Sequence, residues 1–211
     1  MTETEQAAAP PIDVADCDSE RIDITATDKY PAAAIARHKA RYEWAVDKIS
    51  ARFLRAGRVI DFACGQGYGS AMLSAVAEQV YGRDKDAEAI RIANKRHSST
   101  LVNFKVRDRI ERHEGDNTMF DAVVSIETIE HLEDPKQFLQ ACMDLIIPNG
   151  LLVLSTPLKD ALGPGVLRSK FHLLEYSVEE INRLLETAGF IEIRHEAVLD
   201  GFICLTARRP Q

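Results

Sequence analysis

The chain has 211 residues, of which 45% are hydrophobic, and carries a formal net charge of −7. This size and composition suit one globular domain, and the sequence contains no apolar run of the roughly 18 residues that a membrane span needs. The N-terminus lacks the basic and apolar regions of a secretory signal, and the four cysteines show no zinc-site or CxxC spacing. We therefore expect a cytoplasmic protein with reduced thiols.

Most of the negative charge lies at the N-terminus. The first 30 residues contain eight acidic and two basic residues, a net charge of −6, which leaves −1 for the rest of the chain. A nearly neutral body has no general attraction for polyanions, so nucleic-acid binding is not supported. Residues 1–29 have no sustained apolar period and are predicted to be a flexible acidic tail, followed by a single domain over 30–211.

The body of the chain alternates between helical and strand-like patterns. Apolar residues at helical spacing from Ile35 to Phe53 predict a first helix, before a buried strand at 58–63. A glycine-containing loop then leads to a helix over 70–78. The elements predicted next are strand 79–84, helix 86–97, strand 102–108, strand 119–127, helix 134–146 and strand 150–157. This alternation predicts a parallel sheet covered by helices on both faces.

The last third of the chain has a different pattern. Residues 158–175 hold no clean period and are predicted to form an irregular lid. Ser177 and Glu180 have the spacing of a capping box, which predicts a helix that ends at Gly189. The strand-like runs 191–199 and 202–209 are joined at Asp200-Gly201, so a tight hairpin with an antiparallel final strand is expected.

The segment VIDFACGQGYGS places three glycines between a strand and a helix, where a ligand can approach the backbone. Ser70 stands where a dinucleotide fingerprint needs its last glycine, and the charge of Asp61 opposes a pyrophosphate but attracts an ammonium or sulfonium group. Asp84, 19 residues after Gly65, ends the second strand, where a carboxylate can accept hydrogen bonds from both hydroxyls of a ribose.

Five segments in succession carry a family resemblance: VIDFACGQGYG, VYGRD, FDAVVSIETIEHLEDP, NGLLVLSTP and FHLLEYSVEEINRLLETAGF. Over about residues 35–211 the chain resembles the class I S-adenosylmethionine-dependent methyltransferases. The resemblance implies an α/β, Rossmann-like sheet of seven strands in the order 3-2-1-4-5-7-6, with the last strand antiparallel and helices on both faces. It also implies S-adenosylmethionine as cofactor and S-adenosylhomocysteine as product.

The same resemblance implies the cofactor site. It places the following residues around the cofactor: Asp61, Ala63, Gly65, Gly67, Asp84, Lys85, Asp108, Arg109 and Ile126. Ala63 stands where the commoner pattern has glycine, and we expect only a slight tightening of the loop. Asp108 has an alternative role as a salt-bridge partner of the arginines that flank it.

A second group of residues follows the fourth predicted strand. In one helical turn, Glu127, Glu130 and His131 would share a face, and a distant His172 would complete a site suited to Mg²⁺ or Mn²⁺ more than to zinc. The arrangement resembles that of small-RNA 3′-terminal 2′-O-methyltransferases and is similar to that of ubiquinone-biosynthesis O-methyltransferases. In the metal-free alternative, the histidines shape the acceptor pocket or act as general base.

On the first helix, His38, Arg41 and Tyr42 also share a face. They either close over the cofactor or acceptor, or belong to a helix that packs through Tyr42 while Arg41 stays solvated. The segment SIETIEH lacks the Asn/Asp-Pro-Pro-Tyr/Phe motif of amino-group methylation. We therefore expect methylation of a hydroxyl on a small-molecule acceptor, with RNA 2′-O-methylation and a non-catalytic S-adenosylmethionine-binding scaffold as alternatives.

Overall fold

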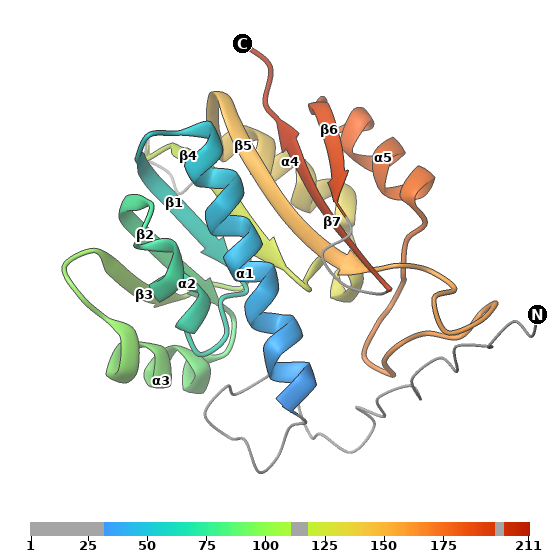
Figure 1. Ribbon diagram of the computed structural model, residues 1–211, viewed down its shortest axis with the longest axis horizontal. Helices are drawn as coiled ribbons and strands as arrows, with labels where there is room; N and C mark the ends of the chain where they lie inside the picture. The colour runs from blue at the N-terminus through green and yellow to red at the C-terminus, as the bar shows by residue number, and fades with distance from the viewer. Residues whose placement is uncertain (1–31, 111–117, 197–200) are drawn as a thin grey trace, which may run out of the picture.

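The computed structural model describes residues 32–110, 118–196 and 201–211 (Figure 1). The predicted acidic tail, residues 1–29, lies outside this part of the chain. No helix within the described ranges is long and apolar enough to cross a membrane.

A seven-stranded sheet forms the centre of the structure. Its strands are β1 (Ala56–Phe62), β2 (Ala77–Asp84), β3 (Val102–Val106), β4 (Phe120–Ile126), β5 (Ile146–Pro157), β6 (Ile191–Glu196) and β7 (Phe202–Arg208). They lie in the order β3-β2-β1-β4-β5-β7-β6, and β7 runs antiparallel to both of its neighbours. The predicted order and the antiparallel last strand are therefore confirmed. Asp200, half of the predicted tight turn, lies outside the described residues.

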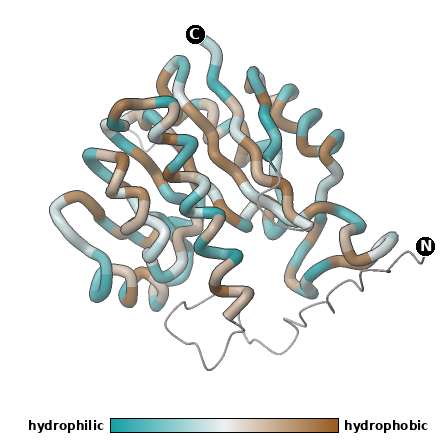
Figure 2. Tube along the Cα trace, viewed as in Figure 1, coloured by the Kyte–Doolittle hydropathy of each residue, from teal (hydrophilic) through white to brown (hydrophobic). Residues whose placement is uncertain are grey.

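Helices cover both faces of this sheet. They are α1 (Ala32–Arg52), α2 (Tyr68–Leu73), α3 (Ala87–His97), α4 (Pro135–Leu145) and α5 (Val178–Thr187), with a short 3₁₀ turn, η1 (Ile129–His131). The first three helices pack on one face and α4 and α5 on the other (Figure 1), so two apolar clusters lie on opposite sides of the strands. The central strands are apolar along most of their length because both of their faces are buried (Figure 2).

Two element boundaries differ from the predictions. The helix predicted over 70–78 ends at Leu73, because Ala77 is fully buried and pairs with Ala56 at the start of β1. Strand β5 begins at Ile146, directly after α4, and its register with β4 is irregular between Phe120 and Ala122.

The predicted local signals of the last third are present in the structure. The Ser177 hydroxyl accepts from the Glu180 amide at 3.2 Å, and the Glu180 carboxylate accepts from the Ser177 amide at 2.8 Å. This is the predicted capping box of α5. Residues 158–175 form turns and bends with one isolated bridge from Leu158 to Tyr176, as expected for an irregular segment.

Candidate active site

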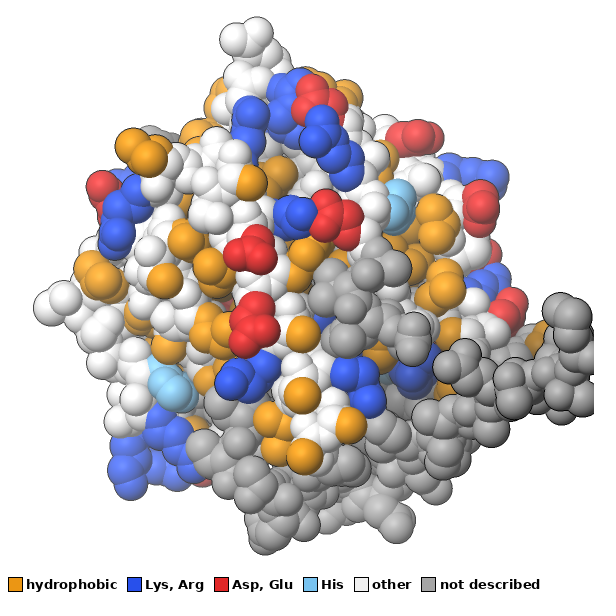
Figure 3. Space-filling view, viewed as in Figure 1, with side chains coloured by type: hydrophobic (Ala, Val, Ile, Leu, Met, Phe, Trp, Pro, Cys, Tyr) orange, Lys and Arg blue, Asp and Glu red, His pale blue; other side chains and the backbone are white. Residues whose placement is uncertain are grey.

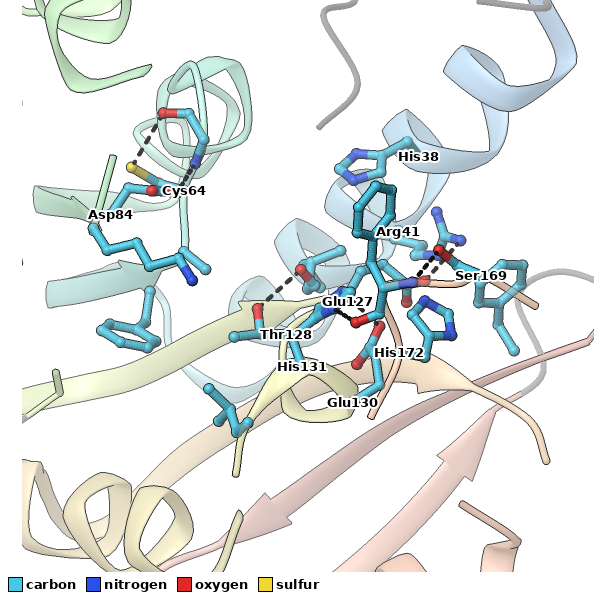
Figure 4. Close-up of a pocket in the computed structure, with 18 of the residues that line it drawn as sticks. His38, Arg41, Cys64, Asp84, Glu127, Thr128, Glu130, His131, Ser169 and His172 are labelled. Carbon is cyan, nitrogen blue, oxygen red and sulfur yellow. Dashed lines mark hydrogen bonds and ion pairs between the residues drawn. The ribbon is translucent and has the colours of Figure 1, made fainter. Parts of the chain in front are cut away.

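A cavity of about 590 Å³ opens at the carboxyl ends of β1, β2 and β4. Further walls come from α1, from the irregular segment 158–175 and from Phe202 at the start of β7. Figure 4 shows Cys64 and Asp84 at one end and Glu130, His172 and Ser169 at the other. Ligands of open parallel sheets bind at this edge, so the cavity is the candidate active site.

The glycine loop forms one wall of the cavity. Gly65 lines it with a φ of +53°, and its amide donates to the Asp84 carboxylate at 2.9 Å. Gly67, with a φ of +85°, has a different role, because a Cβ there would lie 2.7 Å from the Phe104 ring. Gly67 is therefore required for packing beneath the loop and is not among the lining residues.

Ala63 lines the cavity with a φ of +61°, in the left-handed region that glycine adopts more easily. Alanine in place of the glycine of the commoner pattern thus introduces backbone strain at residue 63. From the sequence we expected only a slight tightening of the loop. Cys64 beside it is 3% exposed, and burial raises the pKa of its thiol, so the side chain packs as a small apolar group.

The other predicted cofactor residues divide between the cavity wall and the outside. Asp84, Lys85, Asp108 and Ile126 line the cavity, and Asp84 is fixed by a second amide, that of Asp86, at 2.9 Å. Arg109 is exposed and does not line it. A carboxylate that accepts from two backbone amides is held in one orientation.

Asp61 lies behind the glycine loop and does not line the cavity. It is fully buried and accepts hydrogen bonds from the Ser70 hydroxyl at 2.6 Å and the Tyr42 hydroxyl at 3.2 Å. Burial is the main cause that raises the pKa of Asp61 to about 7. The predicted contact of Asp61 with the cofactor therefore stays a prediction, because the glycine loop lies between Asp61 and the cavity.

His38, Arg41 and Tyr42 of α1 all line the cavity, as their shared helical face predicted. Arg41 is only 4% exposed and its guanidinium lies 3.4 Å from the Glu127 carboxylate. The alternative prediction, in which Arg41 stays solvated, is therefore wrong. The His38 ring contacts the Tyr68 hydroxyl through Nδ1. Burial, with a contribution from Arg41, lowers the pKa of His38 to about 3, so its imidazole is neutral near pH 7.

Glu127 does not join the predicted set of metal ligands. It has a φ of +52° and precedes η1, so Glu127 is not on the same helical turn as Glu130 and His131. Its carboxylate accepts from the Ser155 hydroxyl at 2.7 Å and pairs with Arg41. The prediction that Glu127, Glu130 and His131 share one helical face is wrong, because the backbone is left-handed at Glu127, directly after β4.

Glu130, His131 and His172 do come together. One possible ligand atom from each lies within 4.8 Å of those of the others, and the two imidazole rings meet edge to face at 5.0 Å. The Glu130 carboxylate is fully buried and accepts from the Thr156 hydroxyl at 3.0 Å. We call these three residues the Glu-His-His group.

Both imidazoles of this group are oriented through Nδ1. Nδ1 of His131 lies 3.0 Å from the Phe171 carbonyl, and Nδ1 of His172 lies 2.6 Å from the Glu175 carboxylate. Because both acceptors require a proton on Nδ1, each neutral ring presents a lone pair at Nε2. Metal-binding histidines are commonly held in this way. One carboxylate and two imidazoles fit Mn²⁺ or a later transition metal better than Mg²⁺, because Glu127 is not included.

Several lining residues were missed by the sequence analysis. Arg37 and Tyr68 come from helices, Arg168 and Phe171 from the irregular segment, and Phe202 from β7. Arg37 lies one turn before Arg41 in the same helical face and was detectable by spacing. The positions from the irregular segment and β7 follow no local period, so no sequence signal indicated them.

Comparison with known proteins supports the fold and identifies the family. Residues 35–196 match a family described as a methyltransferase domain. A probable S-adenosylmethionine-dependent methyltransferase of Mycolicibacterium smegmatis is 36% identical over 138 residues, which cover 64% of this chain and 52% of the relative. A protein of the same description from Mycobacterium tuberculosis is 30% identical over 159 residues, 74% of this chain and 55% of the relative.

A ubiquinone biosynthesis O-methyltransferase of Xanthomonas oryzae is 35% identical over 114 residues, 53% of this chain and 48% of the relative. The chain thus spans about half the length of the curated relatives it matches.

Solved structures share the fold. The DhpI–S-adenosylhomocysteine complex has a TM-score of 0.67 and 21% identity, covering 89% of this chain and 93% of that chain. The methyltransferase domain of bacterial CtHen1-C has a TM-score of 0.67 and 20% identity, covering 83% and 100%. Together with the seven-stranded sheet, the family match over residues 35–196 shows that this chain belongs to the class I S-adenosylmethionine-dependent methyltransferases.

Proposed function

We propose that this chain transfers a methyl group from S-adenosylmethionine to a hydroxyl oxygen of a small molecule. The observation that carries this proposal is the Glu-His-His group, whose two imidazoles present Nε2 at the end of the cavity opposite Asp84. The nucleoside of the cofactor would bind at Asp84, and a proton acceptor lies at the far end of the cavity. This arrangement suits methyl transfer from the sulfonium of the cofactor to an acceptor molecule bound beside the proton acceptor. The similarity to a ubiquinone biosynthesis O-methyltransferase supports a hydroxyl acceptor.

The cofactor would lie along the glycine loop. Asp84 would accept from the ribose hydroxyls, and the backbone at Ala63 and Gly65 would border the methionine part. Asp61 would act through the loop, since a carboxylate behind it favours the positive ammonium and sulfonium over a phosphate. Lys85, Asp108 and Ile126 would border the nucleoside.

Methyl transfer is an in-line displacement, so the protein must bring the acceptor oxygen to attack distance and remove its proton. His131 or His172 would accept that proton at Nε2, because Nδ1 of each ring is already held by the Phe171 carbonyl or the Glu175 carboxylate. Glu175 would stabilise the imidazolium that results at His172.

Glu130, His131 and His172 would also hold a divalent transition metal. Such an ion lowers the pKa of a coordinated hydroxyl and so supplies an alternative to a protein base. In either form of the chemistry, Glu130 and the two histidines hold the acceptor hydroxyl beside the cofactor.

The test measures transfer of a labelled methyl group from S-adenosylmethionine to a panel of hydroxylated small molecules, with the product bond identified by NMR. We expect O-methyl products, and His131→Asn should lower kcat by about 100-fold or more with little change in cofactor affinity. His97→Asn, at the end of α3 and outside the cavity, is the matched control. An N-methyl product would refute the proposed acceptor. Unchanged turnover in His131→Asn, His172→Asn and Glu130→Gln would refute the proposed role of the group.

RNA 2′-O-methylation is a second candidate, because the Glu-His-His group keeps three of the four residues on which the resemblance to the RNA enzymes rests. On the face drawn in Figure 3, acidic and basic side chains are interspersed, which does not favour a polyanion there. Methyl transfer to the 3′ end of a short RNA, measured in parallel, distinguishes this candidate. A non-catalytic scaffold would bind cofactor but leave every acceptor unmethylated.

A further inference from the structure

Three arginines converge on the cavity at its acceptor end. Arg37 and Arg41 come from successive turns of α1, and Arg168 comes from the irregular segment. Two of them lie over the Phe202 ring, with the Arg41 guanidinium carbon 4.0 Å and the Arg168 guanidinium carbon 4.6 Å from its centroid. We call these three arginines, with Phe202, the arginine cluster.

These arginines repel one another. Burial, together with the charges of Arg41 and Arg168, lowers the pKa of Arg37. Burial is the main cause that lowers the pKa of Arg168, and Arg41 adds to it against the raising effect of Glu175 and Glu127. The Arg41 side chain is buried, with 4% of its surface exposed. Like charges in partial burial are costly unless an anion lies between them.

Two acidic residues near the cluster, Glu127 and Glu175, offset part of its charge. The Glu127 carboxylate is shared between Arg41 and the Ser155 hydroxyl. The Glu175 carboxylate is occupied by the His172 ring and by the backbone amide of residue 168, at 2.6 Å each. Three guanidinium groups thus face two carboxylates, which leaves a surplus of one positive charge.

Donors in the cluster are also left over. Among the described residues, the buried Nε atoms of Arg41 and Arg168 have no hydrogen-bond acceptor. A guanidinium Nε–H and its neighbouring NH₂ are the pair that binds a carboxylate or phosphate with two parallel hydrogen bonds. Two such unused donors at one end of a cavity indicate a place for an anionic ligand group.

We propose that Arg37, Arg41 and Arg168 form a subsite for a carboxylate or phosphate group on the methyl acceptor, which is therefore a hydroxylated anion. This inference rests on the proposed function. Apolar side chains from the irregular segment, Leu162, Phe171 and Leu173, border the same end and remain partly exposed. They suit an acceptor whose anionic group and hydroxyl are carried on an apolar body.

The negative groups of the cofactor are the competing explanation. On that explanation, the single carboxylate of S-adenosylmethionine would be met by Arg41, which lies with His38 on the α1 side of the cavity (Figure 4). Arg168 belongs to the irregular segment, beside Ser169 and away from the glycine loop. The two explanations therefore differ at Arg168, which is the residue to test.

The experiment saturates the protein with S-adenosylhomocysteine, so that the cofactor's own carboxylate is in place. Binding of 3-hydroxybenzoate, of its neutral counterpart 3-hydroxybenzyl alcohol and of inorganic phosphate is then measured by calorimetry or NMR. We expect 3-hydroxybenzoate to bind about tenfold or more tightly than the alcohol, and phosphate to compete with it. Arg168→Gln should remove this preference and leave the affinity for S-adenosylhomocysteine unchanged.

Arg168→Lys keeps the charge and should retain part of the preference, while Arg183→Gln, an exposed position on α5, is the matched control. Equal binding of acid and alcohol would overturn the proposal. The proposal would also be overturned if Arg168→Gln weakened the binding of S-adenosylhomocysteine and left the binding of 3-hydroxybenzoate unchanged, because the subsite would then belong to the cofactor. Binding of the acid through Arg168, with no methyl transfer to any hydroxylated acceptor, would support an anion subsite and refute the proposed O-methylation separately.

Discussion

The buried carboxyl of Asp61 makes the stability of this protein depend on pH in a defined direction. Burial raises the pKa of Asp61 from 3.8 to about 7, against the opposing effect of hydrogen bonds from Ser70 and Tyr42. In the unfolded chain the carboxyl ionises near its ordinary pKa. Between those two values the folded protein therefore holds a proton that the unfolded chain has released, so this group lowers the free energy of unfolding as pH rises.

The magnitude follows from the two pKa values. From pH 5 to about pH 7 the Asp61 carboxyl is protonated in the folded protein and ionised in the unfolded chain. Raising the pH from 5 to 8 should therefore lower the free energy of unfolding by about 2.5 kcal/mol. Asp61→Asn keeps the shape of the side chain and cannot ionise. The free energy of unfolding of the wild type, relative to that of Asp61→Asn, should therefore decrease by about 2.5 kcal/mol from pH 5 to pH 8.

The assay is urea denaturation of both proteins at several pH values, with the free energy of unfolding taken from each curve. Other titrating groups are common to both proteins and cancel in the difference. Asp121→Asn, which removes a carboxylate from the neighbouring strand β4, is the matched control. Parallel pH profiles for wild type and Asp61→Asn, within about 0.5 kcal/mol, would refute the argument that burial raises the pKa of Asp61 in the folded protein.

Three further perturbations test the loop and the last helix. Gly67→Ala should lower the free energy of unfolding by about 2 kcal/mol or more, because its Cβ would lie 2.7 Å from the Phe104 ring, and thermal unfolding measures this. Ala63→Gly should relieve a left-handed φ of +61° that costs about 1 kcal/mol, so an unfolding midpoint clearly below that of the wild type would contradict the strain. Ser177→Ala removes the capping box of α5 and should cost about 1 kcal/mol in urea denaturation, whereas a cost near zero would mean that packing alone holds the helix start.

The sequence by itself determined the alternation of strands and helices and the position of the cavity, while the order of the sheet was implied by the family resemblance. Strand and helix periods are local properties of the chain, and the glycine loop marks the strand end at which a parallel sheet binds its ligands. The capping box at Ser177 and the shared face of His38, Arg41 and Tyr42 are likewise set by spacing within a few residues. These features could be predicted because neighbouring residues alone decide them.

Tertiary structure decided which side chains meet in the cavity. A single left-handed backbone angle at Glu127 separates this residue from Glu130, and spacing cannot predict that angle. Asp61 stands behind the glycine loop because Tyr42, far away in the chain, donates to it from α1. Arg168 and His172 reach the cavity through long-range packing of a segment without a period. The direction of a side chain beyond the end of a strand depends on which distant residues pack against it, and only the folded chain contains that information.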